Sequence, residues 1–192
     1  IQLSANRMHV LIDLGLAAAQ DARRDRLLAD FEGAPRLRRP DLYYHHGLVA
    51  NGFAPDADYR GHHYVFATNS LGFRDRTVRR VPVHRPPSMR YRLLFIGDSF
   101  TEGLGVDWES SFVGRVAQAF AADSVEVLNA GVASYSPILM DRKLRDLIGR
   151  VGLAVDEVAV VVDLSDVRNE LDYRGIASIE DQRFVDRRPA WR

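Results

Sequence analysis

The chain has 192 residues, with 26 basic and 26 acidic side chains and no cysteine. The zero formal net charge argues against an electrostatic nucleic-acid interface, and the lack of cysteine excludes disulfides and thiolate metal sites. The hydrophobic content of 46% and the charged content of 27% are ordinary for a globular protein. We therefore expect one sizeable domain, or one domain with an arm.

The first part of the chain predicts a helix and then an irregular arm. Residues 4–30 carry apolar side chains at helical spacing, and Pro40 ends this pattern. The apolar run MHVLIDLGLAAA contains His9 and Asp13 and is shorter than the roughly 20 apolar residues that span a bilayer, so we expect no membrane segment. Residues 41–90 are rich in Gly, Asp, Pro, Tyr and His, with short strand-like pieces such as YVFAT, and indicate an arm rather than a second core.

After the arm, strand and helix patterns alternate. We expect strands in YRLLFIG, VEVLNA and DEVAVVVDLSD, and helices in SSFVGRVAQAFAA and SPILMDRKLRDLIGRVG. Ser110 or Ser111 would cap the first helix and Ser136 the second. The third strand is apolar on both faces, which is typical of a parallel sheet covered by helices. We therefore predict an α/β chain, with residues 1–90 as helix and arm and residues 91–192 as a doubly wound, three-layer α/β/α domain.

Polar residues and glycines follow each of the three predicted strands. The first strand ends in GDS (residues 97–99), the second in NAG (residues 129–131) and the third in DLSD (residues 163–166). The carboxyl ends of parallel strands lie along one edge of a sheet, where ligands bind. A serine hydroxyl is a poor nucleophile until geometry and a base activate it. We expect Ser99 at a tight strand-to-helix turn, with backbone N–H groups, including that of Gly131, facing a developing negative charge.

Four segments, in this order along the chain, resemble the SGNH/GDSL hydrolase family. TNSLGFRD resembles a segment that precedes the first block in a bacterial subgroup of these proteins. GDSFTEG resembles the first block, whose serine is the nucleophile, and NAGVASYS resembles the second block, whose glycine N–H joins the oxyanion hole. DLSD occupies the place of the third block, which is usually Gly-x-Asn-Asp. The resemblance covers about residues 41–175.

Carried over residue by residue, the resemblance implies a role for five positions. Ser99 would be the nucleophile and Gly131 an oxyanion donor, while Asp98 would brace the turn. The asparagine expected in the third block is Ser165 here, and its single hydroxyl could donate one hydrogen bond. Asn169, four residues further on, is the alternative donor.

The resemblance also implies a general-base histidine in an Asp-x-x-His block far C-terminal to the serine. All six histidines precede Ser99, and fewer strands can be recognised than the family's sheet contains. We therefore expect a domain that is incomplete at its C-terminus, with the base outside this chain. The alternatives are a base recruited from the arm, for which His84 is the best candidate, and a protein that has lost catalysis. In an incomplete domain the third strand would be an unpaired edge, and we expect either a missing segment that covers it or a homo-oligomer.

The function implied by the resemblance is acyl transfer by an activated serine. We expect an ester hydrolase or an acyl-transferring enzyme that acts on an acyl ester, such as an ester of a carbohydrate, and that uses no cofactor. A non-catalytic SGNH-like binding module and a polysaccharide O-acetyltransferase are the alternatives. The family subgroup is often exported or membrane-anchored, and the residues themselves leave the localisation open.

Structural roles compete with these assignments. Ser99 could simply cap the helix after a buried strand, and Gly131 could allow a sharp turn. Asp166 could cap a helix or brace a loop. In LGFRD, Phe73 could pack against the core and Arg74 could form an ion pair, although the resemblance also allows Arg74 to orient a substrate.

Two pairs of adjacent histidines, His45-His46 and His62-His63, raise the question of a metal site. Adjacent residues on a strand point to opposite faces, so neither pair would chelate an ion by itself. No His-x-His or His-x-x-x-His spacing supports them. We expect polar loop residues here and no metal site.

Overall fold

A computed structural model describes residues 37–41, 43–164, 166 and 170 of the chain. The helix predicted over residues 4–30 lies outside the described residues. No helix in the part of the chain that the structure describes is long and apolar enough to cross a membrane.

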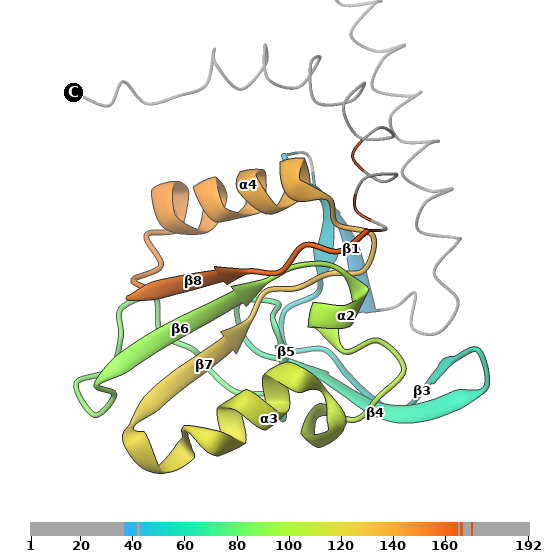
Figure 1. Cartoon of the computed structure of the whole chain (residues 1–192), viewed down its shortest axis with the longest axis horizontal. Coiled ribbons are helices and arrows are strands. Elements are labelled where there is room, and N and C mark those ends of the chain that lie inside the picture. The colour runs from blue at the N-terminus through green and yellow to red at the C-terminus, as the bar shows by residue number, and fades with distance from the viewer. Residues whose placement is uncertain (1–36, 42, 165, 167–169, 171–192) are drawn as a thin grey trace, which may run out of the picture.

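The described chain is an α/β structure built on a mixed six-stranded sheet in the order β3-β4-β5-β7-β6-β8 (Figure 1). The strands are β3 (Phe53–Tyr59), β4 (His62–Thr68), β5 (Arg74–Asp75), β6 (Tyr91–Ile96), β7 (Val125–Asn129) and β8 (Glu157–Val160). A second, two-stranded sheet pairs β1 (Arg38–Asp41) with β2 (His45–Leu48). The α/β class predicted from the sequence is confirmed.

The large sheet is parallel in one half and antiparallel in the other. Strands β6, β7 and β8 are parallel, whereas β3, β4 and β5 form an antiparallel meander that joins β7 through β5. The meander comes from the region that the sequence predicts to be an irregular arm. Arg60 and Gly61 connect β3 to β4 with φ angles of 55° and 82°, the positive values of a type I′ hairpin turn. The arm therefore extends the same sheet.

Within the described residues, three α-helices follow strands β6 and β7: α2 (Ser99–Glu102), α3 (Phe112–Ala119) and α4 (Pro137–Arg145). Short 3₁₀ turns lie at Trp108–Ser110 and Ala121–Asp123, and a π-helical turn at Asp146–Arg150 continues α4. Ser111 caps α3 by accepting a hydrogen bond from the Gly114 N–H at 3.1 Å, as one of the two predicted cap positions. Ser136 stands at the cap position of α4 without a side-chain capping bond, and Pro137 begins that helix.

Side chains that alternate along β6 and β7 fill two separate cores. Leu94 and Leu128 lie in a buried cluster with Leu144 of α4. The neighbouring residues Phe95 and Val127 instead pack in the cluster that includes side chains of α3. Because successive strand residues point to opposite faces, α3 and α4 cover opposite sides of the parallel strands (Figure 1).

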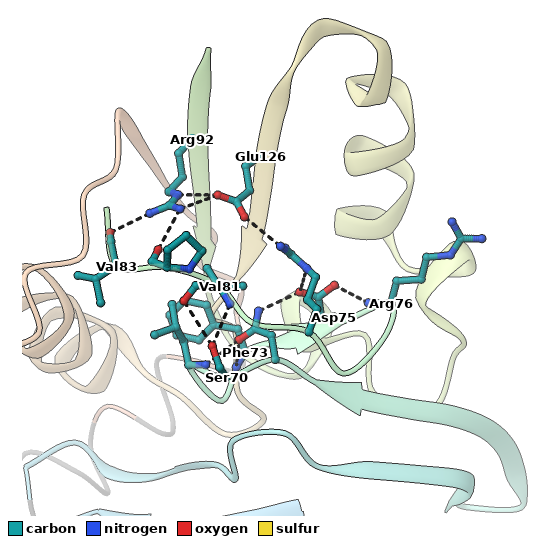
Figure 2. A network of polar contacts seen from close by, with 12 residues as sticks. Ser70, Phe73, Asp75, Arg76, Val81, Val83, Arg92 and Glu126 are labelled. Carbon is teal, nitrogen blue, oxygen red and sulfur yellow. Dashed lines mark hydrogen bonds and ion pairs between the residues drawn. The ribbon is translucent and has the colours of Figure 1, made fainter. Parts of the chain in front are cut away.

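A network of ion pairs and hydrogen bonds connects residues 69–83 to the parallel strands (Figure 2). Arg92 of β6 is fully buried, and its guanidinium lies 2.7 and 2.8 Å from a carboxylate oxygen of Glu126 on β7. Arg79 donates hydrogen bonds to both Glu126 and Asp75, and the Asn69 amide donates to Asp75 at 2.9 Å. The guanidinium of Arg92 also donates to the backbone carbonyl groups of Pro82, Val83 and Ala154. Each charge in this network has a partner of opposite sign.

The LGFRD segment has a structural role. Phe73 is fully buried in the core, as the structural alternative predicts. Arg74 is also buried, but its guanidinium donates to the carbonyl oxygens of Val65 and Val106, at 2.9 and 3.1 Å, and lies 4.3 Å above the Phe66 ring. Burial lowers the pKa of Arg74. Among the described residues, no carboxylate forms the ion pair that the sequence suggested for Arg74.

Candidate functional site

Helix α2 lies beyond the carboxyl end of β6 (Figure 1). Ser99 is the first residue of this helix and follows the last residue of β6 by three positions. Asp98 caps this helix, since its Oδ1 accepts the Phe100 N–H at 3.0 Å. A Cβ atom on Gly97 would lie 2.1 Å from the Thr101 Oγ1 atom and 2.9 Å from the Val161 carbonyl oxygen. Only glycine fits there without a shift of its neighbours, so Ser99 stands at the tight strand-to-helix turn that the sequence predicts.

The Ser99 hydroxyl is half-buried and has an acidic neighbour. Its Oγ donates to Asp98 Oδ2 at 3.5 Å, a long hydrogen bond. No histidine in the described part of the chain forms a hydrogen bond with Ser99. His84 is exposed, and its carbonyl oxygen accepts from Arg92 near the amino end of β6, whereas Ser99 follows the carboxyl end. This arrangement separates His84 from the serine by the length of the strand.

Gly131, in the loop after β7, lies directly against α2. A Cβ atom at this position would come within 2.8 Å of the Glu102 backbone nitrogen and 2.7 Å of Thr101 Cγ2. The Gly131 N–H donates to Asn129 Oδ1 at 3.0 Å, and the Asn129 amide donates to the Thr101 carbonyl at 2.6 Å. The loop is thus fastened to the helix that begins with the serine. The N–H group that the resemblance assigns to an oxyanion has an internal acceptor here.

Glu102, at the end of the helix that Ser99 begins, connects α2 to β1 and to the loop after β7. Its carboxylate accepts two hydrogen bonds from the Arg38 guanidinium of β1, at 2.7 and 3.0 Å, and one from the Ala133 N–H at 2.7 Å. The two charged side chains are 0% and 5% exposed. Sequence reasoning missed this pair. An acid three residues after Ser99 was the available signal for Glu102, and nothing in the sequence marks Arg38 as its partner.

Lys143 of α4 contacts the loop after β7 that contains Gly131. It is the only lysine in the sequence and is buried, and its Nζ donates to the Ala130 carbonyl at 3.0 Å. Three aromatic ring centroids lie 5.1–5.7 Å from Nζ, those of Tyr44, Phe73 and Tyr135. Desolvation lowers the pKa of Lys143 to about 7. The lysine therefore titrates near neutral pH, against the loop that contains Gly131.

The interpretation of His45 and His46 as polar loop residues is wrong. Both are buried on β2, and their Nδ1 atoms are 2.9 Å apart, because His45 adopts a left-handed φ of 70° that interrupts the alternation of faces. His46 Nε2 lies 2.9 Å from the Ala133 carbonyl, which can only accept, so Nε2 carries the proton and Nδ1 accepts from His45. Burial lowers the pKa of His46 well below its ordinary value. His62 and His63 lie on β4 and are exposed.

Three carboxylates gather beside Ser99. One oxygen from each of Asp98, Asp163 and Asp166 lies within 4.8 Å of the other two. Asp163 and Asp166 follow β8, which is paired with β6, so the two strand ends meet as predicted for parallel strands. Desolvation raises the pKa of Asp98, and Asp163 adds to the shift. Desolvation also raises the pKa of Asp166 to about 6, with further contributions from the charges of Asp98, Asp163 and Glu170.

The structure brings three of the five assigned residues together. Asp98, Ser99 and Gly131 lie around the first turn of α2 at the carboxyl edge of the parallel strands. Ser165 and Asn169 lie outside the described residues, so their roles stay predictions. A serine at a strand-to-helix turn beside a glycine loop can act as a nucleophile if a base takes its proton, and a carboxylate cluster can hold a cation.

Neither a scan against protein-family models nor a search of curated proteins finds a match to this chain.

Proposed function

We propose that this chain is a serine-dependent ester hydrolase or acyl-transferring enzyme of SGNH type, with Ser99 as the nucleophile. The observation that carries the proposal is the position of Ser99, on a tight turn after β6 with the Gly131 loop packed against the same helix. Ligands of open α/β sheets bind at this edge. In this proposal β6, β7 and β8, with α3 and α4 on their two faces, correspond to part of the three-layer core of an SGNH-like domain.

In the proposed reaction, Ser99 Oγ attacks the carbonyl carbon of an acyl ester. The bond to the leaving oxygen breaks, the serine proton passes through a base to that oxygen, and water or an acceptor hydroxyl later removes the acyl group from Ser99. The N–H groups of Ser99 and Gly131 would hold the oxyanion, with Ser165 or Asn169 as a further donor. For Gly131 this requires its N–H to leave Asn129 Oδ1. A His–Asp pair outside this chain would supply the base.

The proposed substrate is an acyl ester, with an ester of a carbohydrate as the leading class. This part of the proposal comes from the breadth of the resembled family. A polysaccharide O-acetyltransferase would use the same serine and would pass the acyl group to a sugar hydroxyl while excluding water. The two activities differ only in the acceptor of the acyl group.

A second candidate is a non-catalytic binding module, and two contacts favour it. The hydrogen-bond partner of Ser99 Oγ is the carboxylate of Asp98, and the Gly131 N–H is already bonded to Asn129. Both groups would have to change partners before acyl transfer.

Self-association of the chain is also part of the proposal. Strand β8 is at the edge of the sheet within the described chain, and Val160, Val162 and Leu164 are exposed there. Such an edge can pair with another strand. Light scattering during size-exclusion chromatography is expected to show a homo-oligomer, and a monomer at all concentrations would contradict this part.

The test of the nucleophile is labelling with a serine-directed fluorophosphonate, read by intact mass. Ser99→Ala is compared with Ser110→Ala, in which an exposed serine of the neighbouring 3₁₀ turn is removed. An adduct that is lost only in Ser99→Ala supports the enzyme and places an activating base within these residues. An adduct that forms only on a longer chain with an Asp-x-x-His block supports the enzyme with an external base. No adduct on either chain supports the binding module.

A further inference from the structure

The carboxylate cluster beside Ser99 has a property that acyl transfer does not use. We propose that Asp98, Asp163 and Asp166 bind a hard divalent cation, of the Ca²⁺ or Mg²⁺ class, at the carboxyl edge of the parallel strands. One oxygen from each residue lies within 4.8 Å of the others. Metal–oxygen distances of about 2.0–2.6 Å put two ligand oxygens of one ion at most about 5 Å apart, so the three oxygens fit a single ion.

Asp166 provides the independent evidence for a ligand. Its side chain is buried, with only 1% of the residue exposed. Asp166 Oδ2 accepts the Asp163 N–H at 2.9 Å, whereas Oδ1 is buried with no hydrogen-bond partner. A buried carboxylate oxygen without a donor is costly, because it has lost its water and gained nothing in return. A cation held between the three carboxylates would satisfy this oxygen.

Within the part of the chain that the structure describes, the charges that act on Asp98 and Asp166 are acidic. Within the described chain, neither Asp98 nor Asp166 forms an ion pair with an arginine or a lysine. Glu170 adds a fourth acidic group to the field at Asp166. Carboxylates this close repel one another, and a divalent ion would remove that repulsion. The ligands are all oxygen, which favours Ca²⁺ or Mg²⁺ over Zn²⁺.

The positions of the three ligands suggest what the ion would do. Asp98 is held by the Phe100 N–H at the turn between β6 and α2, whereas Asp163 and Asp166 belong to the segment after β8. A bound ion would therefore join two neighbouring strand ends beside Ser99. The ion would stabilise the folded chain, since a ligand that binds only the native state raises its stability. This inference concerns ion binding and stands whether or not Ser99 is a nucleophile.

The test is isothermal titration of the whole chain, freed of metal with a chelator, with CaCl₂ and separately with MgCl₂. We expect one site per chain with a dissociation constant of about 0.1–1 mM, and a higher melting temperature in the presence of the ion. Asp163→Asn and Asp166→Asn are expected to weaken binding by about tenfold or more. Asp123→Asn, which changes an exposed acid on the 3₁₀ turn after α3, should bind like the wild type.

Several outcomes would overturn the proposal. These are no binding heat and no change in melting temperature at several millimolar of either ion, binding that survives in both cluster variants, or binding of Zn²⁺ alone. Circular dichroism in the presence of chelator checks that each variant folds. If Asp166→Asn does not fold, Asp163→Asn decides the matter, because Asp163 is only half-buried. The melting temperature of the wild-type chain with and without the ion needs no variant at all.

Discussion

The two ends of the parallel strands differ in how their buried charged side chains are arranged. At the amino end, two arginines and two carboxylates form a closed network in which each charge has a partner (Figure 2). At the carboxyl end, three aspartates lie together beside Ser99, and two of them have raised pKa values. Paired charges stabilise the fold, whereas carboxylates that repel one another cost stability, and it is at these carboxylates that we propose a bound cation. Substitutions at the two ends should therefore differ in size and in sign.

The largest effect is expected at the amino end, from Arg92→Met. The substitution keeps much of the side-chain volume but removes the charge that faces Glu126, leaving a buried carboxylate with Arg79 alone. We expect the free energy of unfolding to fall by about 3–5 kcal/mol, measured by urea denaturation. Arg115→Met on the exposed face of α3 should stay within about 0.5 kcal/mol of the wild type. Equal small losses in both variants would show that the network is not a source of stability.

The next effect concerns the packing of the carboxyl end, through Gly131→Ala. The new Cβ would meet the Glu102 nitrogen at 2.8 Å, so the loop or α2 must move. We expect a loss of about 1–3 kcal/mol in the free energy of unfolding, as for other overpacked sites. Gly149→Ala is the matched control, since nothing lies within 4 Å of its Cβ position. A neutral Gly131→Ala would mean that the loop is not held against the helix.

A smaller effect is expected from pH, through Lys143. Its pKa in the folded chain is about 7, whereas an unfolded lysine has a pKa of about 10.4. Between these values the unfolded chain binds more protons, so stability rises with pH, by at most about 1.4 kcal/mol per pH unit. This contribution is fully present above about pH 10.4 and is lost as the pH falls through about 7.

Urea denaturation between about pH 7 and pH 9 checks this prediction. Lys143→Met should reduce the slope of unfolding free energy against pH relative to the wild-type chain, because the methionine cannot titrate. Equal slopes would show that Lys143 keeps an ordinary pKa. The aromatic rings that surround Nζ would then stabilise its charge as well as water does.

The parallel half of the fold could be predicted because its signals are local. Strands β6 and β7 are mainly apolar apart from Arg92 and Glu126, and the cap at Ser111 stands directly before its helix. In the antiparallel half, the strand-like run YVFAT does lie in β4, but the hairpin was not predicted, since the turn at Arg60 and Gly61 lacks the Asn-Gly or Asp-Gly pair that marks one. The apolar third strand predicted helical cover on both faces, yet Val160 is 51% exposed on β8. Whether a strand is central or at an edge depends on its neighbours, which the pattern of one strand does not contain.

The candidate site divides in the same way. The turn at Ser99 and the meeting of the first and third strand ends follow from parallel topology. The ion pair of Arg38 with Glu102 joins residues 64 positions apart, from β1 of the small sheet to helix α2, and no spacing rule links them. The contact between the His45 and His46 rings comes with a left-handed backbone angle at His45, which is uncommon for any residue other than glycine. Long-range pairing and unusual dihedral angles were therefore the features that the sequence did not reveal.

The smallest effect is expected from Asp166→Asn. It compares the two ends directly, because the same change, aspartate to asparagine, can be made at Asp75 in the charge network. Asp75→Asn removes a charge that Arg79 and Asn69 hold, and should cost about 1–3 kcal/mol. Asp166→Asn, measured in chelator, removes one of three repelling carboxylates, and its amide oxygen can still accept the Asp163 N–H. We expect a change of no more than about 0.5 kcal/mol, or a gain. A loss as large as that of Asp75→Asn would mean that the aspartates at the carboxyl end are held by partners as firmly as those at the amino end, which would remove the reason to expect a cation there.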